Sequence, residues 1–144
     1  MIRTARTIYT GAAWLFITGV IVQVFLAGMV VVARQISWNN HISLGHILSA
    51  PLLFMLVTMY LGRMPRQVNN LTWTLFVVYL LQADVIIFMR QVMPVISAFH
   101  PVLALIDFAL GYALARQAVA LLRENSPSPA GLKNAEPSTR LKSG

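Results

Sequence analysis

Cysteine is absent from this 144-residue chain, and its absence excludes several kinds of chemistry at once. Without a thiol, the protein can form no disulfide, thiolate nucleophile, zinc–thiolate site or iron–sulfur cluster. No Ser-His-Asp spacing typical of a nucleophilic triad can be recognised either. Any redox chemistry must therefore be carried by a bound cofactor.

Charged residues are also scarce, since they make up 10% of the chain while 58% of the residues are apolar. A water-facing surface cannot be built at that ratio, so a soluble fold is excluded. The formal net charge of +7 does not indicate a nucleic-acid partner, because the Lys and Arg residues lie between apolar runs and in a tail. The expected partner is the lipid bilayer.

Four apolar runs are long enough to cross a bilayer as α-helices. They cover about residues 7–33, 41–62, 71–89 and 97–115. The short links between them require consecutive helices to be antiparallel neighbours. The sequence thus predicts an all-α integral membrane protein, an up-down four-helix bundle over residues 1–122, with a disordered cytoplasmic tail over residues 123–144. Pro51 cannot donate a hydrogen bond to the carbonyl of Ile47 and is expected to kink the 41–62 helix.

Lys and Arg residues are distributed unevenly between the two sides of such a bundle. Arg34 and Arg90 lie on one side. The other side carries nine, which are Arg3, Arg6, Arg63, Arg66, Arg116, Arg123, Lys133, Arg140 and Lys142. Because cytoplasmic segments carry the excess of positive charge, this bias places both termini in the cytoplasm. The compact design and the absence of sorting signals favour a bacterial inner membrane.

Three histidines lie in the half of the expected bundle that is nearer the outer face of the membrane. His41 and His46 are on the 41–62 helix, and His100 is on the 97–115 helix. Two inward histidines on facing helices suit haem b, whose iron takes two axial imidazoles. His46 lies about 7 Å deeper than His41 and is turned about 140° from it, so only one of them can share an iron with His100. His41 fits better, because its depth is nearly that of His100.

Arg34 and Arg90 are the cations on the outer side of the expected bundle. They are placed to meet the two haem propionates through charge-assisted hydrogen bonds. The predicted cofactor site therefore consists of His41 or His46, His100 and these two arginines.

A cofactor-free interpretation stays open. The histidines could be hydrogen-bonded core residues paired with Asp84, Asn40 or a backbone carbonyl, while the arginines extend to the interface. Gln23 and Gln82 are expected to be hydrogen-bond partners between helices. A proton path that includes Asp107 would stop halfway across, because few titratable groups lie on its inner side.

Three short motifs carry a resemblance to known proteins: Trp38-Asn-Asn-His41-Ile-Ser-Leu44-Gly45, Leu81-Gln82 and His100-Pro101-Val102-Leu103-Ala104-Leu105. On these motifs, residues 9–117 resemble a family of uncharacterised bacterial four-helix membrane proteins and, more distantly, one four-helix half of haem A synthase. There, histidines on the second and fourth helices bind haem, which implies that His41 and His100 are the ligands. Haem A synthase carries a glutamate where this chain has Trp38, so oxidation of a haem methyl group is not expected.

The sequence therefore predicts a small membrane b-type haem protein that transfers electrons or serves as a subunit of a membrane redox complex. The alternative is a cofactor-free structural or accessory subunit of a membrane protein complex. The two interpretations differ in whether His41 and His100 bind a metal.

Overall fold

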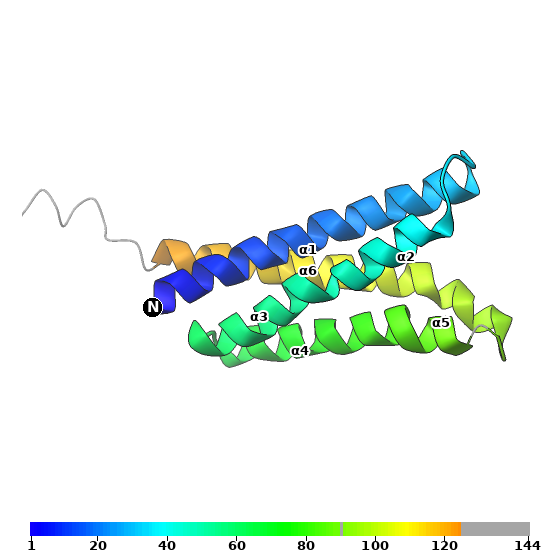
Figure 1. Ribbon diagram of the computed structural model, residues 1–144. Helices are drawn as coiled ribbons and strands as arrows, with labels where there is room; N and C mark the ends of the chain where they lie inside the picture. The colour runs from blue at the N-terminus through cyan, green and yellow to red at the C-terminus, as the bar shows by residue number, and fades with distance from the viewer. Residues whose placement is uncertain (90, 125–144) are drawn as a thin grey trace, which may run out of the picture.

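The computed structural model describes residues 1–89 and 91–124, and the regular structure of that part of the chain is helical. Four helical rods follow one another, as the predicted all-α fold requires (Figure 1). The rods are α1 (Ile2–Val31); α2 (Trp38–Ile47) with α3 (Ser49–Leu61); α4 (Arg66–Leu80) with the π-helix η1 (Leu81–Val85) and α5 (Ile86–Met89); and the 3₁₀-helix η2 (Pro94–Phe99) with α6 (His100–Glu124).

Each rod packs against two neighbours, so the four rods form a closed ring. α1 packs against α2 and α3 on one side and against α6 on the other, while α4 packs against α3 and α6. The start of α1, the end of α6 and the α3–α4 turn lie at one end of the bundle, and the α1–α2 turn and η2 lie at the opposite end (Figure 1). Consecutive rods are thus antiparallel.

Pro51 interrupts the second rod as predicted. α2 ends at Ile47 and α3 begins at Ser49, with Leu48 between them. The carbonyl of Ile47 is the group that the proline leaves without its helical donor. The kink is packed closely on α1, because a Cβ added to Gly19 would lie 2.1 Å from Cδ2 of Leu48.

Several helix ends differ from the expected ones. α4 begins at Arg66 instead of 71, because Pro65 directly before it has a fixed φ and lacks an N–H, which suits the start of a helix. α6 continues past 115 to Glu124, since neither glycine nor proline occurs between 116 and 124. Of the expected disordered tail, residues 125–144 lie outside the described residues.

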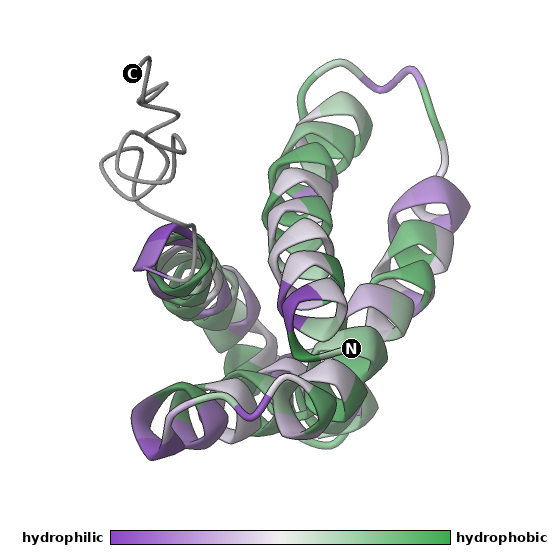
Figure 2. Cartoon of the chain, turned by 90° about the vertical axis from the view of Figure 1, so that its left-hand side faces the viewer, coloured by the Kyte–Doolittle hydropathy of each residue, from purple (hydrophilic) through white to green (hydrophobic). Residues whose placement is uncertain are grey.

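Three of the rods are long and apolar enough to cross a membrane, namely Ile2–Val31, Trp38–Leu61 and Pro94–Glu124. Figure 2 shows hydrophobic residues along most of the helix lengths and hydrophilic ones concentrated towards the turns and ends. Such a surface suits contact with lipid rather than with water. The chain therefore has the composition and helix lengths of a membrane protein.

Packing is uneven along the bundle. The half that contains the chain ends, here called the terminal half (residues 1–20, 48–79 and 107–124), holds most of the buried side chains, including Tyr9, Phe16, Leu52, Met55, Met59, Leu75 and Leu114. The other half, here called the histidine half (residues 21–47 and 80–106), has two buried residues among those whose burial is described, Gln82 and Ile86. The rods are thus held together mainly at one end.

Hydrogen bonds reinforce the terminal half. The hydroxyl groups of Tyr9 on α1 and Thr72 on α4 lie 2.6 Å apart in the core. Arg6 donates from Nε to the carbonyl oxygen of Gly62 at 2.9 Å and from Nη2 to that of Arg63 at 3.2 Å. These two carbonyls follow the end of α3, where helical carbonyls lack internal partners and a cation is favourable.

Candidate functional site

His41 lies on α2 and turns one edge of its ring towards α1. Its Nδ1 atom lies 3.1 Å from the backbone carbonyl oxygen of Gln23. A carbonyl oxygen only accepts hydrogen bonds, so Nδ1 carries the proton and the neutral ring keeps its lone pair on Nε2. The indole of Trp38 packs edge-on against the imidazole, with ring centres 5.6 Å apart. The ring is therefore oriented from two directions.

His100 is held in the same way at the start of α6. Its Nδ1 atom lies 3.2 Å from the backbone carbonyl oxygen of Gln82 in η1. In this π-turn the N–H of Ile86 donates to the carbonyl of Leu81 instead of to that of Gln82. The carbonyl of Gln82 thus loses its usual helical partner and is free to accept from His100.

The two helical hairpins repeat one arrangement. In each, a histidine contacts the main chain of a glutamine 18 residues earlier, on the preceding antiparallel rod. Gln23 and Gln82 are hydrogen-bond partners between helices, as expected, and the contact to each histidine uses the backbone carbonyl. Their Oε1 atoms are buried without a hydrogen-bond partner. The equal Gln–His spacing is the sequence signal that could have revealed this arrangement.

The structure brings His41 and His100 together. Their ring centres are 6.0 Å apart, and the ring planes are inclined by 65°. Because each Nδ1 is bonded to the preceding rod, Nε2 is the nitrogen that each ring has left for another partner. Two nitrogen donors from opposite sides of the bundle therefore share one site.

Two of the other predicted site residues, His46 and Arg34, are exposed and make no hydrogen bond or ring contact with this pair. His46 is exposed, and its Nδ1 lies 2.9 Å from the carbonyl oxygen of Ile42 on its own helix. Arg34 is exposed in the α1–α2 turn, at the same end of the bundle as the histidines, and has a positive φ of 55°. Arg90 lies outside the described residues. Of the predicted site residues that the structure describes, His41 and His100 thus lie together, and Arg34 lies at the same end of the bundle.

The two aspartates of the helical rods differ in their surroundings. Asp84 is exposed on η1. The Nδ1 atoms of His41 and His100 both lie at hydrogen-bond distance from backbone carbonyl oxygens, so the suggestion that Asp84 accepts a hydrogen bond from one of these histidines is wrong. Asp107 on α6 is fully buried, and neither of its carboxyl oxygens has a hydrogen-bond partner. Sequence reasoning placed Asp107 near the middle of the bundle but could not foresee that it would be unpaired.

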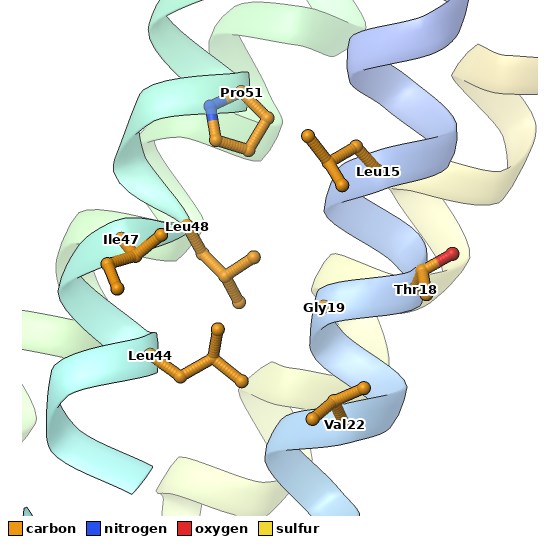
Figure 3. Close-up of a pocket in the computed structure, with 8 residues that line it drawn as sticks. All are labelled: Leu15, Thr18, Gly19, Val22, Leu44, Ile47, Leu48 and Pro51. Atoms are coloured by element: carbon orange, nitrogen blue, oxygen red, sulfur yellow. The ribbon is translucent and has the colours of Figure 1, made fainter. Parts of the chain in front are cut away.

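Two apolar hollows lie between the helices. One, of about 230 Å³, lies between α1 and the kinked rod and is lined by Gly19, Val22, Leu44 and Leu48 among others (Figure 3). The second, of about 450 Å³, lies between η1, α5 and the start of α6, where Phe99 and Leu103 flank His100. The second hollow lies within the loosely packed histidine half, whereas the first spans the boundary between the two halves.

Residues 23–89 are similar to a family of unknown function, DUF6220. The matched segment begins at Gln23, includes His41 and Gln82, and ends before His100. Neither a curated protein nor a solved structure matches the chain. The resemblance to an uncharacterised family is therefore supported over this segment, and nothing in the comparisons links the chain to haem A synthase.

Proposed function

We propose that this protein is a small membrane haem protein that binds one haem b between His41 and His100 and passes electrons, alone or as a subunit of a membrane redox complex. The single observation that carries the proposal is the position of the two imidazoles. With a metal–nitrogen bond of about 2 Å and about 1 Å from nitrogen to ring centre, imidazoles on opposite sides of one ion have centres about 6 Å apart. The ring centres here are 6.0 Å apart.

The hydrogen bonds at Nδ1 support the same proposal. A metal-binding histidine usually donates its second N–H to a carbonyl or carboxylate, which fixes the tautomer and the ring orientation. Gln23 and Gln82 provide such carbonyls for His41 and His100. Both rings are therefore prepared to bind through Nε2.

Haem fits this donor set better than a bare ion does. A protein-bound ion such as zinc takes three or four protein ligands, and no group of three His, Cys, Asp or Glu side chains suited to a metal is found among the described residues. A porphyrin supplies four nitrogen ligands itself, so two histidines complete the coordination of its iron. The loosely packed histidine half and its apolar hollows offer the surroundings that a flat macrocycle needs.

The proposal includes the topology and location argued from the sequence. Four membrane crossings, with both termini in the cytoplasm of a bacterial inner membrane, place the histidine pair near the outer face. Arg34 then lies beside the outer opening of the site, where its guanidinium can meet a propionate, and Arg90 is assigned the second propionate. Trp38 stands where haem A synthase carries a glutamate, so we propose electron transfer without oxidation of a haem methyl group.

The test is the visible spectrum of full-length protein purified in detergent from haem-replete cells, first oxidised and then reduced with dithionite. Six-coordinate haem b is expected to give sharp α and Soret bands on reduction. A featureless spectrum would overturn the proposal.

A cofactor-free accessory subunit is the second candidate, and the loose histidine half favours it, because a partner helix could fill the same space. This candidate expects that His41→Gln and His100→Gln leave the accumulation of the protein unchanged, since glutamine retains a hydrogen bond. The haem proposal expects both variants to lose the spectrum.

A further inference from the structure

Asp107 is a buried acidic residue whose carboxylate, when ionised, needs a positively charged partner. Its side chain is fully buried on α6, and both carboxyl oxygens lack a hydrogen bond. Burying an ionised carboxylate without a partner costs several kcal/mol or more, so such groups are neutralised by a proton or balanced by a positive charge. The described surroundings of Asp107 provide few candidates for either role.

Among the described residues, the elements that pack around Asp107 carry no cationic side chain near its level. α6 packs against α1, α4, η1 and η2. Lys and Arg are absent between Arg6 and Arg34 on the α1 side, from Gln67 to Met89 on the third rod, and between His100 and Arg116 on α6. Within residues 1–89 and 91–124, these elements therefore offer the buried carboxyl group no lysine or arginine to balance it.

The titratable groups on the same elements are already bonded or point elsewhere. On α1 the Tyr9 hydroxyl is bonded to Thr72, and on α4 the Tyr79 hydroxyl donates to the carbonyl of Gly45. Asp84 on η1 is exposed. On α6 itself, Tyr112 is exposed and packs against Trp14. η2 carries no titratable side chain. The remaining source of positive charge beside these elements is the oxidised haem that we propose between His41 and His100.

Geometry connects Asp107 to that site. It follows His100 by seven residues, which places it on the same face of α6 and about 10 Å deeper along the helix. The carbonyl of Gln82 is level with His100, so Tyr79, three residues earlier on the third rod, lies at a depth between the two. Because the dielectric constant inside the bundle is low, a change of one unit of charge at the histidine site alters the electrostatic potential at Asp107 over this distance.

We propose that Asp107 is a redox-linked proton acceptor, whose carboxylate takes one proton from the aqueous phase when the centre held by His41 and His100 gains one electron. This inference rests on the proposed haem function, because a bis-histidine haem changes its charge by one unit between its two oxidation states. The electron comes from a one-electron reductant, the proton comes from water, and the product is a neutral carboxylic acid. When the centre is oxidised again, the Asp107 carboxyl group releases this proton to the aqueous phase.

The test is a redox titration of the haem in full-length protein in lipid nanodiscs, from about pH 5 to about pH 9. In the wild type, the midpoint potential is expected to fall as the pH rises, because reduction binds a proton. In Asp107→Asn this pH dependence is expected to be lost. Asp84→Asn is the matched control, because it removes an exposed carboxylate from the neighbouring rod, and it is expected to behave as the wild type does.

An infrared difference spectrum of the wild type, reduced minus oxidised, gives a second measurement that needs no variant. A carbonyl band of a protonated carboxyl group is expected to appear on reduction and to shift in deuterated water. A pH-independent potential in the wild type, a pH dependence that survives in Asp107→Asn, or the absence of this band would each overturn the inference while leaving the haem. Absence of any haem spectrum would overturn the proposed function and this inference with it.

Discussion

His41 and His100 are 59 positions apart in the sequence, yet their ring centres lie 6.0 Å from each other. Each ring is held by one backbone carbonyl of the preceding rod and reaches towards the other hairpin. The pair thus joins the two hairpins in the half of the bundle that has few other buried contacts. Its proposed role in binding haem and its contribution to packing can be separated by substitution.

Replacing a ligand is expected to remove the haem. In His41→Ala and His100→Ala, the iron would lose one axial imidazole, so the bands of six-coordinate haem should disappear from the reduced spectrum. His46→Ala is the matched control, because this exposed ring is bonded to its own helix, and its spectrum should equal that of the wild type. A normal spectrum in His100→Ala would refute the ligand assignment.

Gly19→Ala is expected to lower stability. The added methyl group would lie 2.1 Å from Cδ2 of Leu48, so this leucine must turn towards the neighbouring hollow. Overpacking of this kind costs about 1 to 3 kcal/mol, and the adjoining space favours the lower value. Unfolding by SDS in mixed micelles measures the effect.

The control for that experiment is Gly11→Ala. No atom lies within 4 Å of a Cβ added at Gly11, and the residue is exposed in the same helix. Alanine is the better helix former by about 1 kcal/mol, so this variant should be as stable as the wild type or more stable. Equal destabilisation by both substitutions would argue against close packing at the kink.

Tyr9→Phe is expected to destabilise the terminal half by about 1 kcal/mol, the usual net contribution of a buried hydrogen bond. The variant removes the hydroxyl group that lies 2.6 Å from that of Thr72, while Thr72 keeps its bond to the carbonyl of Val68. Tyr60→Phe is the control, because its hydroxyl accepts from Trp73 on the exposed surface. The same unfolding assay should show a smaller loss for the control than for Tyr9→Phe.

Reporter fusions test the topology. A reporter at the C-terminus and one in the α3–α4 turn should both indicate the cytoplasm, and one in the α1–α2 turn should indicate the outside. The bias of nine Lys and Arg residues against two requires this result. If the two cytoplasmic reporters gave opposite signals, the number of membrane crossings would have to be revised.

The helical rods could be predicted because long apolar runs and a proline act locally. The four runs specify four antiparallel helices, and Pro51 specifies the break beside Leu48. The start of α4 was predicted too late, because the polar residues after Pro65 were assigned to the link although they continue a helix well. Polarity alone does not distinguish an exposed helical turn from a loop.

The site could be predicted only in part. Helix depth indicated that His41 and His100 lie at one level, since rise per residue is fixed. The acceptors of their Nδ1 atoms could not be foreseen, because any residue can provide a backbone carbonyl. The π-turn that frees the carbonyl of Gln82 has no clear mark in the sequence, and the unpaired state of Asp107 depends on how the rods pack around it.

Anchoring both histidines to main-chain oxygens makes the site tolerant of change at the glutamines. A substitution at Gln23 or Gln82 alters an amide whose Oε1 atom is unpaired, while the carbonyl that orients the imidazole stays in place. The orientation of each imidazole ring is therefore set by the helical backbone. The side chains of the two glutamines can therefore vary without disturbing the hydrogen bonds that orient the two imidazoles.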